Sequence, residues 1–83
     1  EPAIALDARG DLVIASTEVV AGRSRVVVHR GATLDALGPP TVASDEGEEA
    51  SSPALVAVPD GLFVAYLAGP PFRTRVRVAW LPP

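Results

Sequence analysis

Short apolar runs separated by turn-forming residues occupy most of this chain. Each run is rich in Val, Leu, Ile or Ala and is bounded by Gly, Pro, Asp or Ser, a pattern typical of β-strands. The seven runs are Ala3–Leu6, Leu12–Thr17, Arg25–His29, Pro40–Ser44, Ala54–Val58, Leu62–Ala68 and Arg75–Leu81. No window has the three-to-four-residue apolar spacing of an amphipathic helix, although Ala32–Gly38 has room for one helical turn. The pattern predicts an all-β protein.

The apolar runs also fall into a repeat. The segment "GRSRVVVH" at Gly22–His29 returns as "FRTRVRVA" at Phe72–Ala79, a spacing of about 50 residues. We therefore divide the single β region 1–83 into two units, 1–50 and 51–83. Each unit contains three predicted strands; the first continues into a fourth, whereas the second stops after its third.

An antiparallel four-stranded unit repeated at this spacing is typical of a β-propeller blade. The sequence thus predicts two propeller-type blades, the second without its outer strand, within a larger or oligomeric β-propeller. A seven-stranded immunoglobulin-like sandwich is the alternative, because it has the same number of strands. It leaves the repeat unexplained, and the Cys–Trp–Cys spacing of antibody domains is absent.

The stretch "SPALVAVPDGLFVAYLA" at 52–68, followed by "RTRVRVAWL" at 73–81, resembles the blades of sialidase-like (BNR-type) β-propellers. The Asp-box of that family would fall within His29–Gly38, where its Asp-x-Gly pair and its Trp are missing, so the box is degenerate. The arginine motif of true sialidases is also absent. The resemblance implies the fold and an extracellular or cell-envelope location, but not the sialidase activity.

Composition narrows the classes of partner. The chain has 83 residues, 48% of them hydrophobic, with a net charge of −3 and no Cys. A net acidic chain is a poor ligand for nucleic acid, and the absence of Cys excludes disulfides and thiolate metal sites. No apolar run approaches the ~18 residues of a membrane span, so we predict none.

The repeated arginines are the candidate ligand-binding residues. They are Arg23, Arg25, Arg73 and Arg75. Guanidinium groups bind carboxylates or phosphates through two parallel hydrogen bonds, which suits an acidic carbohydrate or protein ligand. The alternative is structural: the arginines would pair with Glu18 or with the acidic segment between the units, while their stems cover apolar surface. Their presence in both units favours the structural interpretation.

The acidic segment between the units is a candidate calcium site. Its carboxylates are Asp45, Glu46, Glu48 and Glu49. Calcium takes six to eight oxygen ligands, yet the regular spacing of a calcium loop is missing here. The alternative is a solvated loop between blades. The missing spacing favours the solvated loop, so we predict no metal and no cofactor, with calcium as the one candidate.

The function predicted from these features is a non-catalytic binding or scaffold module. No nucleophile, phosphate-loop or metal motif is present, and the lone His29 has no evident catalytic partner. Two alternatives remain: part of a propeller glycoside hydrolase whose catalytic residues lie elsewhere, and an immunoglobulin-like adhesion domain. Because two blades leave apolar faces bare, we expect other blades as partners, from the same parent chain or from identical copies, and an unstable isolated monomer.

Overall fold

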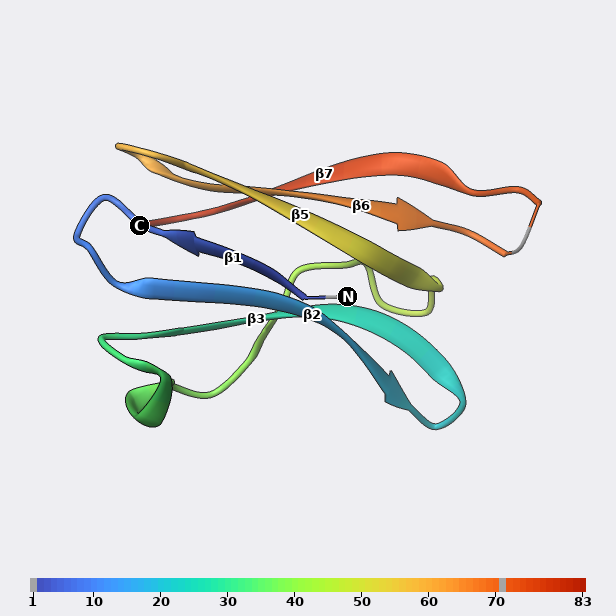
Figure 1. Ribbon diagram of the computed structural model, residues 1–83. Coiled ribbons are helices and arrows are strands. Elements are labelled where there is room, and N and C mark those ends of the chain that lie inside the picture. The colour runs from blue at the N-terminus through green and yellow to red at the C-terminus, as the bar shows by residue number, and fades with distance from the viewer. Residues whose placement is uncertain (1, 71) are drawn as a thin grey trace.

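Two antiparallel sheets lie face to face in the computed structural model of the chain, which describes residues 2–70 and 72–83 (Figure 1). The first sheet has the order β1-β2-β3-β4 and the second the order β5-β6-β7. The strands are β1 Ala3–Leu6, β2 Leu12–Val20, β3 Arg23–Gly31, β4 Thr41–Val42, β5 Ala50–Val58, β6 Gly61–Ala68 and β7 Arg75–Leu81. One short 3-10 turn, η1 at Leu34–Ala36, falls where a helical turn was expected. The all-β prediction is confirmed.

Strand bounds differ from the predicted ones at the β2–β3 hairpin and around the junction of the units. The predicted strands Leu12–Thr17 and Arg25–His29 extend to Leu12–Val20 and Arg23–Gly31, because pairing continues to the turn. The fourth strand shrinks from Pro40–Ser44 to Thr41–Val42. Beyond it, Ser44 contacts β3 through its side chain, whose Oγ accepts a hydrogen bond from the Val26 amide. β5 begins at Ala50 instead of Ala54, since pairing with β6 resumes beyond a register shift between Ser51 and Ala54. Ser52 takes a positive φ of 55° within this shift. The second sheet therefore begins at the last residue of the predicted first unit.

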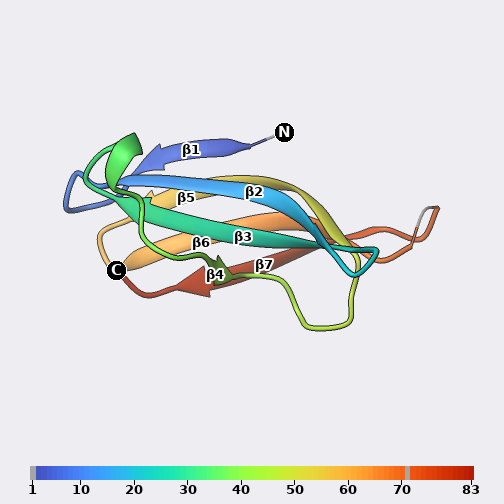
Figure 2. The same ribbon diagram turned by 90° about the horizontal axis from the view of Figure 1, so that it is seen from below.

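Both sheets are meanders in which neighbouring strands are consecutive in the chain (Figure 2). Their registers are also the same. Ala3, Ala15 and Val28 lie side by side across the first sheet, and Ala54, Ala65 and Val78 lie side by side across the second. Val28 and Val78 occupy the same place in the two repeated segments, so the repeat in the sequence is also a repeat in strand pairing.

Each sheet has two faces that correspond between the units, because side chains alternate along a strand. We call the face that carries these rows the alanine face, and the reverse face the leucine face. The leucine face carries Ile4, Leu6, Leu12 and Ile14 in the first sheet, and Leu55, Ala57, Leu62 and Val64 at the corresponding places in the second.

The core lies between the alanine face of the first sheet and the leucine face of the second. Its buried members are Val13, Ala15, Val26 and Val28 from the first sheet and Ala50, Leu62, Val64, Tyr66 and Ala68 from the second. The two remaining faces are only partly covered: Leu6 is 64% exposed on one and Val78 is 63% exposed on the other, although Val27, on the same face as Leu6, is 1% exposed. The alanine faces of the two sheets therefore point in the same direction, so that unlike faces meet. We call this arrangement same-sense stacking.

The β2–β3 hairpin has a strained residue that offers a test of the turn. Val20 pairs with Arg23, so Ala21 and Gly22 form a two-residue loop, with φ values of 53° and 79°. Both residues of this turn type need positive φ, which a Cβ disfavours and which Asn tolerates. We expect Ala21→Asn to raise the free energy of unfolding by about 0.5–1 kcal/mol, measured by urea denaturation.

Gly22→Ala is the matched control for this turn. A Cβ at Gly22 would meet no atom within 4 Å, so its cost would come from the backbone conformation alone. We expect a loss of about 1 kcal/mol. If Ala21→Asn lowered the free energy of unfolding, the assigned turn would be contradicted.

Candidate functional site

Three segments gather at one end of the two sheets: the β2–β3 turn at 21–22, the acidic loop at 45–49 and the described residues of the β6–β7 loop, 69–70 and 72–74 (Figure 2). We call this end the loop rim. Arg23 Nη1 donates to the Gly47 carbonyl oxygen at 2.9 Å, and the Gly69 amide donates to the Glu49 carbonyl oxygen at 2.9 Å. The acidic loop is thus tied to both sheets.

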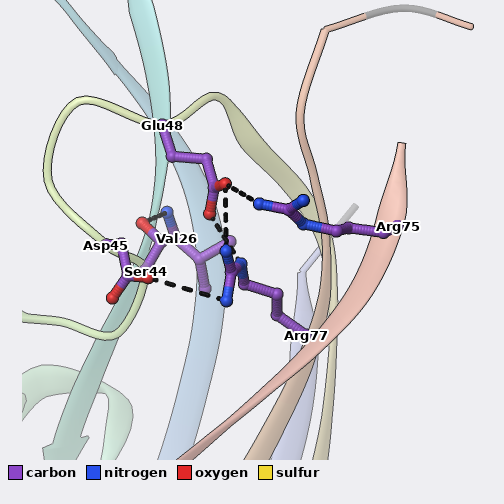
Figure 3. A network of polar contacts seen from close by, with 6 residues as sticks. All are labelled: Val26, Ser44, Asp45, Glu48, Arg75 and Arg77. Atoms are coloured by element: carbon purple, nitrogen blue, oxygen red, sulfur yellow. Dashed lines mark hydrogen bonds and ion pairs between the residues drawn. The ribbon is translucent and has the colours of Figure 1, made fainter. Parts of the chain in front are cut away.

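Glu48 is the centre of the polar network at the rim (Figure 3). One carboxylate oxygen, Oε2, accepts from Arg75 Nη2 at 3.0 Å, while Oε1 lies 2.9 Å from Arg77 Nε in an ion pair. The Glu48 side chain is only 18% exposed, against 63% for Arg75. Asp45 adds a longer contact, 3.9 Å from Arg77 Nη1. The network ties the loop to β7.

The start of the acidic loop is held by a buried hydroxyl. Ser44 is 7% exposed, and its Oγ accepts a hydrogen bond from the Val26 amide of β3 at 3.1 Å. No role of Ser44, Ser24 or Arg77 was predicted from the sequence. The sequence contains a signal only for Arg77, which lies two residues after Arg75 and therefore on the same face of β7.

Glu49 is bound by the other sheet. Its Oε2 accepts from the Ser24 hydroxyl at 2.7 Å and from the Ser24 amide at 3.3 Å. These two hydrogen bonds, helped by the nearby charge of Arg23, hold the pKa of the Glu49 carboxyl below its ordinary value of 4.5. The carboxylate therefore stays ionised in mildly acidic solution.

The lowered pKa makes stability depend on pH. The folded state holds this carboxylate ionised more firmly than the unfolded chain does, so its contribution is complete above pH 4.5 and is lost as the pH falls through the lower folded pKa. We expect Glu49→Gln to be less stable than the native chain at pH 7. The difference should narrow at pH 3, measured by urea denaturation. A difference that stays constant would show that the charge contributes nothing.

Tyr66 lies beneath the acidic loop with only 4% of its surface exposed. Burial raises the pKa of its phenol above the ordinary value of 10, and the negative charge of Asp45 adds to the shift. The neutral phenol is therefore strongly favoured. A tyrosine in this environment is poorly suited to act as a nucleophile.

The predicted arginines lie at the rim but do not form one site. Arg25 pairs with Glu18 at 2.8 Å, Arg75 pairs with Glu48, and Arg23 binds the Gly47 carbonyl. These contacts fit the structural alternative. Arg73 is exposed, and its guanidinium makes no hydrogen bond or ion pair to the described residues.

Two open hollows flank the acidic loop. One, of about 570 Å³, lies between the loop and the β2–β3 hairpin, with Arg25 and Glu46 in its wall. The other, of about 620 Å³, lies toward the β6–β7 loop and is lined by Arg23, Arg73 and Arg75. Three of the four predicted arginines therefore border a single hollow at the rim.

The acidic residues do not converge. Glu48 turns toward Arg75 and Arg77, Glu49 turns toward Ser24, and Glu46 is exposed. Within residues 2–70 and 72–83, no three Asp, Glu, His or Cys side chains form a group that could hold a metal ion. A calcium site at this loop stays a prediction without supporting geometry. The described part of the chain also lacks any helix of the length and hydropathy that a bilayer crossing requires.

Comparison with known proteins gives no relative for this chain. No family model, no curated protein and no solved structure matches it. The resemblance to sialidase-like blades therefore rests on the residues quoted from the sequence alone.

Proposed function

We propose that this chain is a non-catalytic scaffold and binding module, formed by two blades of a sialidase-like β-propeller, that presents the loop rim to a carbohydrate or protein ligand. The observation that carries the proposal is the stacking of two meanders of equal register in the same sense. The alanine face of the first sheet packs on the leucine face of the second, and the loops that would contact a ligand gather at one end.

Same-sense stacking supports blades over an immunoglobulin-like sandwich. In that sandwich, each sheet combines strands that are distant in the chain, through Greek-key connections. Here each sheet holds only consecutive strands, as in a propeller, where one meander follows another. Around a propeller axis, one face of each blade packs on the opposite face of the next blade. The contact between the alanine face of the first sheet and the leucine face of the second is of this kind.

The state of the rim carboxylates supports a non-catalytic role. A glycoside hydrolase that uses two carboxylates needs one whose raised pKa lets it act as a general acid. The pKa of Glu49 is instead lowered by Ser24, and Glu48 is held between two arginines. Each carboxylate has a structural partner that would have to be released before it could act on a substrate.

Two measurements test the proposal. Electron microscopy of the assembled protein should show blade-like sheets related by rotation about one axis; facing sheets related by a twofold axis would overturn the blade assignment. A fluorogenic sialoside and a panel of nitrophenyl glycosides should release no product above the buffer rate. Hydrolysis that is lost in Glu48→Gln would overturn the non-catalytic assignment.

A further inference from the structure

The outer face of the second sheet is an unusually large apolar surface. It consists of the second alanine face, whose members are Ala54, Val56, Phe63, Ala65, Leu67, Val76, Val78 and Trp80. Trp80 is 52% exposed, Val56 58% and Phe63 41%. None of its members is charged. Exposed apolar surfaces of this kind are rare on stable monomers and mark sites of association.

The open face of the first sheet is its leucine face. Ile4 is 65% exposed and Leu6 64% exposed, and they lie beside Ile14 and Leu12 on β2. The chain therefore ends in one uncovered alanine face and one uncovered leucine face. These are the two kinds of surface that already pack together inside the molecule.

From this correspondence we propose that the alanine face of the second sheet binds the leucine face of the first sheet of another copy of this chain. The contact is head-to-tail and repeats the one within the molecule. Interfaces of this type join different surfaces of identical subunits, and they generate closed rings when the rotation closes. This inference rests on the proposed function.

The two open faces differ in side-chain size from their buried counterparts. On the alanine face, Phe63 and Trp80 stand where the first unit has Val13 and Arg30, so this face is bulkier than its buried counterpart. On the leucine face, Ser16 stands where the second unit has the large Tyr66. The smaller side chain leaves room for larger partners, because tight packing needs large residues opposite small ones.

Sedimentation velocity over a range of protein concentrations tests the proposal. The native chain should associate, and Trp80 emission should shift to shorter wavelength as its indole leaves water. Phe63→Lys and Ile4→Lys should each weaken association at least tenfold, because each places a charge in a dry interface. Phe72→Lys is the matched control, since Phe72 is fully exposed in the β6–β7 loop; it should associate like the native chain.

Mixing the two interface variants separates head-to-tail from symmetric association. Phe63→Lys keeps an intact leucine face and Ile4→Lys keeps an intact alanine face, so an equimolar mixture should form one-to-one dimers through these two faces. Because we expect the isolated monomer to be unstable, the mixture should also show more folded structure by circular dichroism than either variant alone. A mixture that stays dissociated, or an Ile4→Lys variant that associates normally, would overturn the inference. A native chain that stays a folded monomer at high concentration would also overturn the inference. The blade assignment is tested separately, and it would fail only if the two sheets within one chain did not stack in the same sense.

Discussion

Leu62→Ala is expected to remove a large share of the stability of the folded chain. Leu62 is fully buried on the leucine face of the second sheet, where it packs in the core shared with Val13 and Ala15. Truncating a buried leucine removes its apolar contacts and leaves a cavity, at a cost of about 2–5 kcal/mol. That range is a large share of the 5–15 kcal/mol that stabilises an ordinary domain. Urea denaturation followed by circular dichroism measures the loss.

Leu34→Ala is the control for this core prediction. Leu34 lies in the short turn η1 and is 67% exposed, so the same chemical change removes little buried surface. We expect its effect to stay below about 0.5 kcal/mol. Similar losses for the two leucines would mean that the sheets do not share the core described above.

The second large effect is expected at Glu48. Glu48→Gln removes the charge that holds Arg77, whose Nε is buried at the junction of the acidic loop and β7. The Arg77 side chain is 38% exposed, so water can replace part of the lost contact, and we expect a loss of about 1–2 kcal/mol. The measurement is urea denaturation at pH 7, at low and at moderate salt. Because Glu48 is only 18% exposed, the loss should depend weakly on salt.

Two further variants locate the source of that loss. Glu46→Gln changes an exposed carboxylate of the same loop and should be nearly neutral. Arg75→Ala breaks the outer ion pair, in which the arginine is 63% exposed, and should cost less than about 1 kcal/mol. If Glu46→Gln were as harmful as Glu48→Gln, a general effect of loop charge would replace the specific contact with Arg77.

The candidate site was predicted less completely than the strands. The arginine pairs could be singled out because they recur, and the acidic loop because its charge interrupts an apolar chain. Their partners could not be chosen, since Glu18 and the acidic loop were equally available to Arg25 and Arg75 on the sequence alone. The roles of Ser24 and Ser44 left no trace, because a serine hydroxyl bonds whichever polar group the fold brings within reach.

The approximate positions of the strands and their order could be predicted from the sequence alone. Alternating β-branched residues and turn residues at fixed places determine where a strand starts and ends, and the repeated segments fixed which residues of the two halves correspond. The equal pairing of Ala3 with Ala15 and of Ala54 with Ala65 came only from the structure, because the first hairpin leaves five residues between Leu6 and Leu12 and the second leaves two between Val58 and Gly61.

Which face of each sheet is buried was decided only by the tertiary structure. The first and second strands of both units are apolar on both sides, so their pattern gives neither face an advantage, and burial depends on where the neighbouring sheet lies. The structure places the second sheet against the alanine face of the first and leaves one face of each kind uncovered. The side-chain pattern was therefore sufficient for the strands, whereas the direction of stacking came from contacts between residues far apart in the chain.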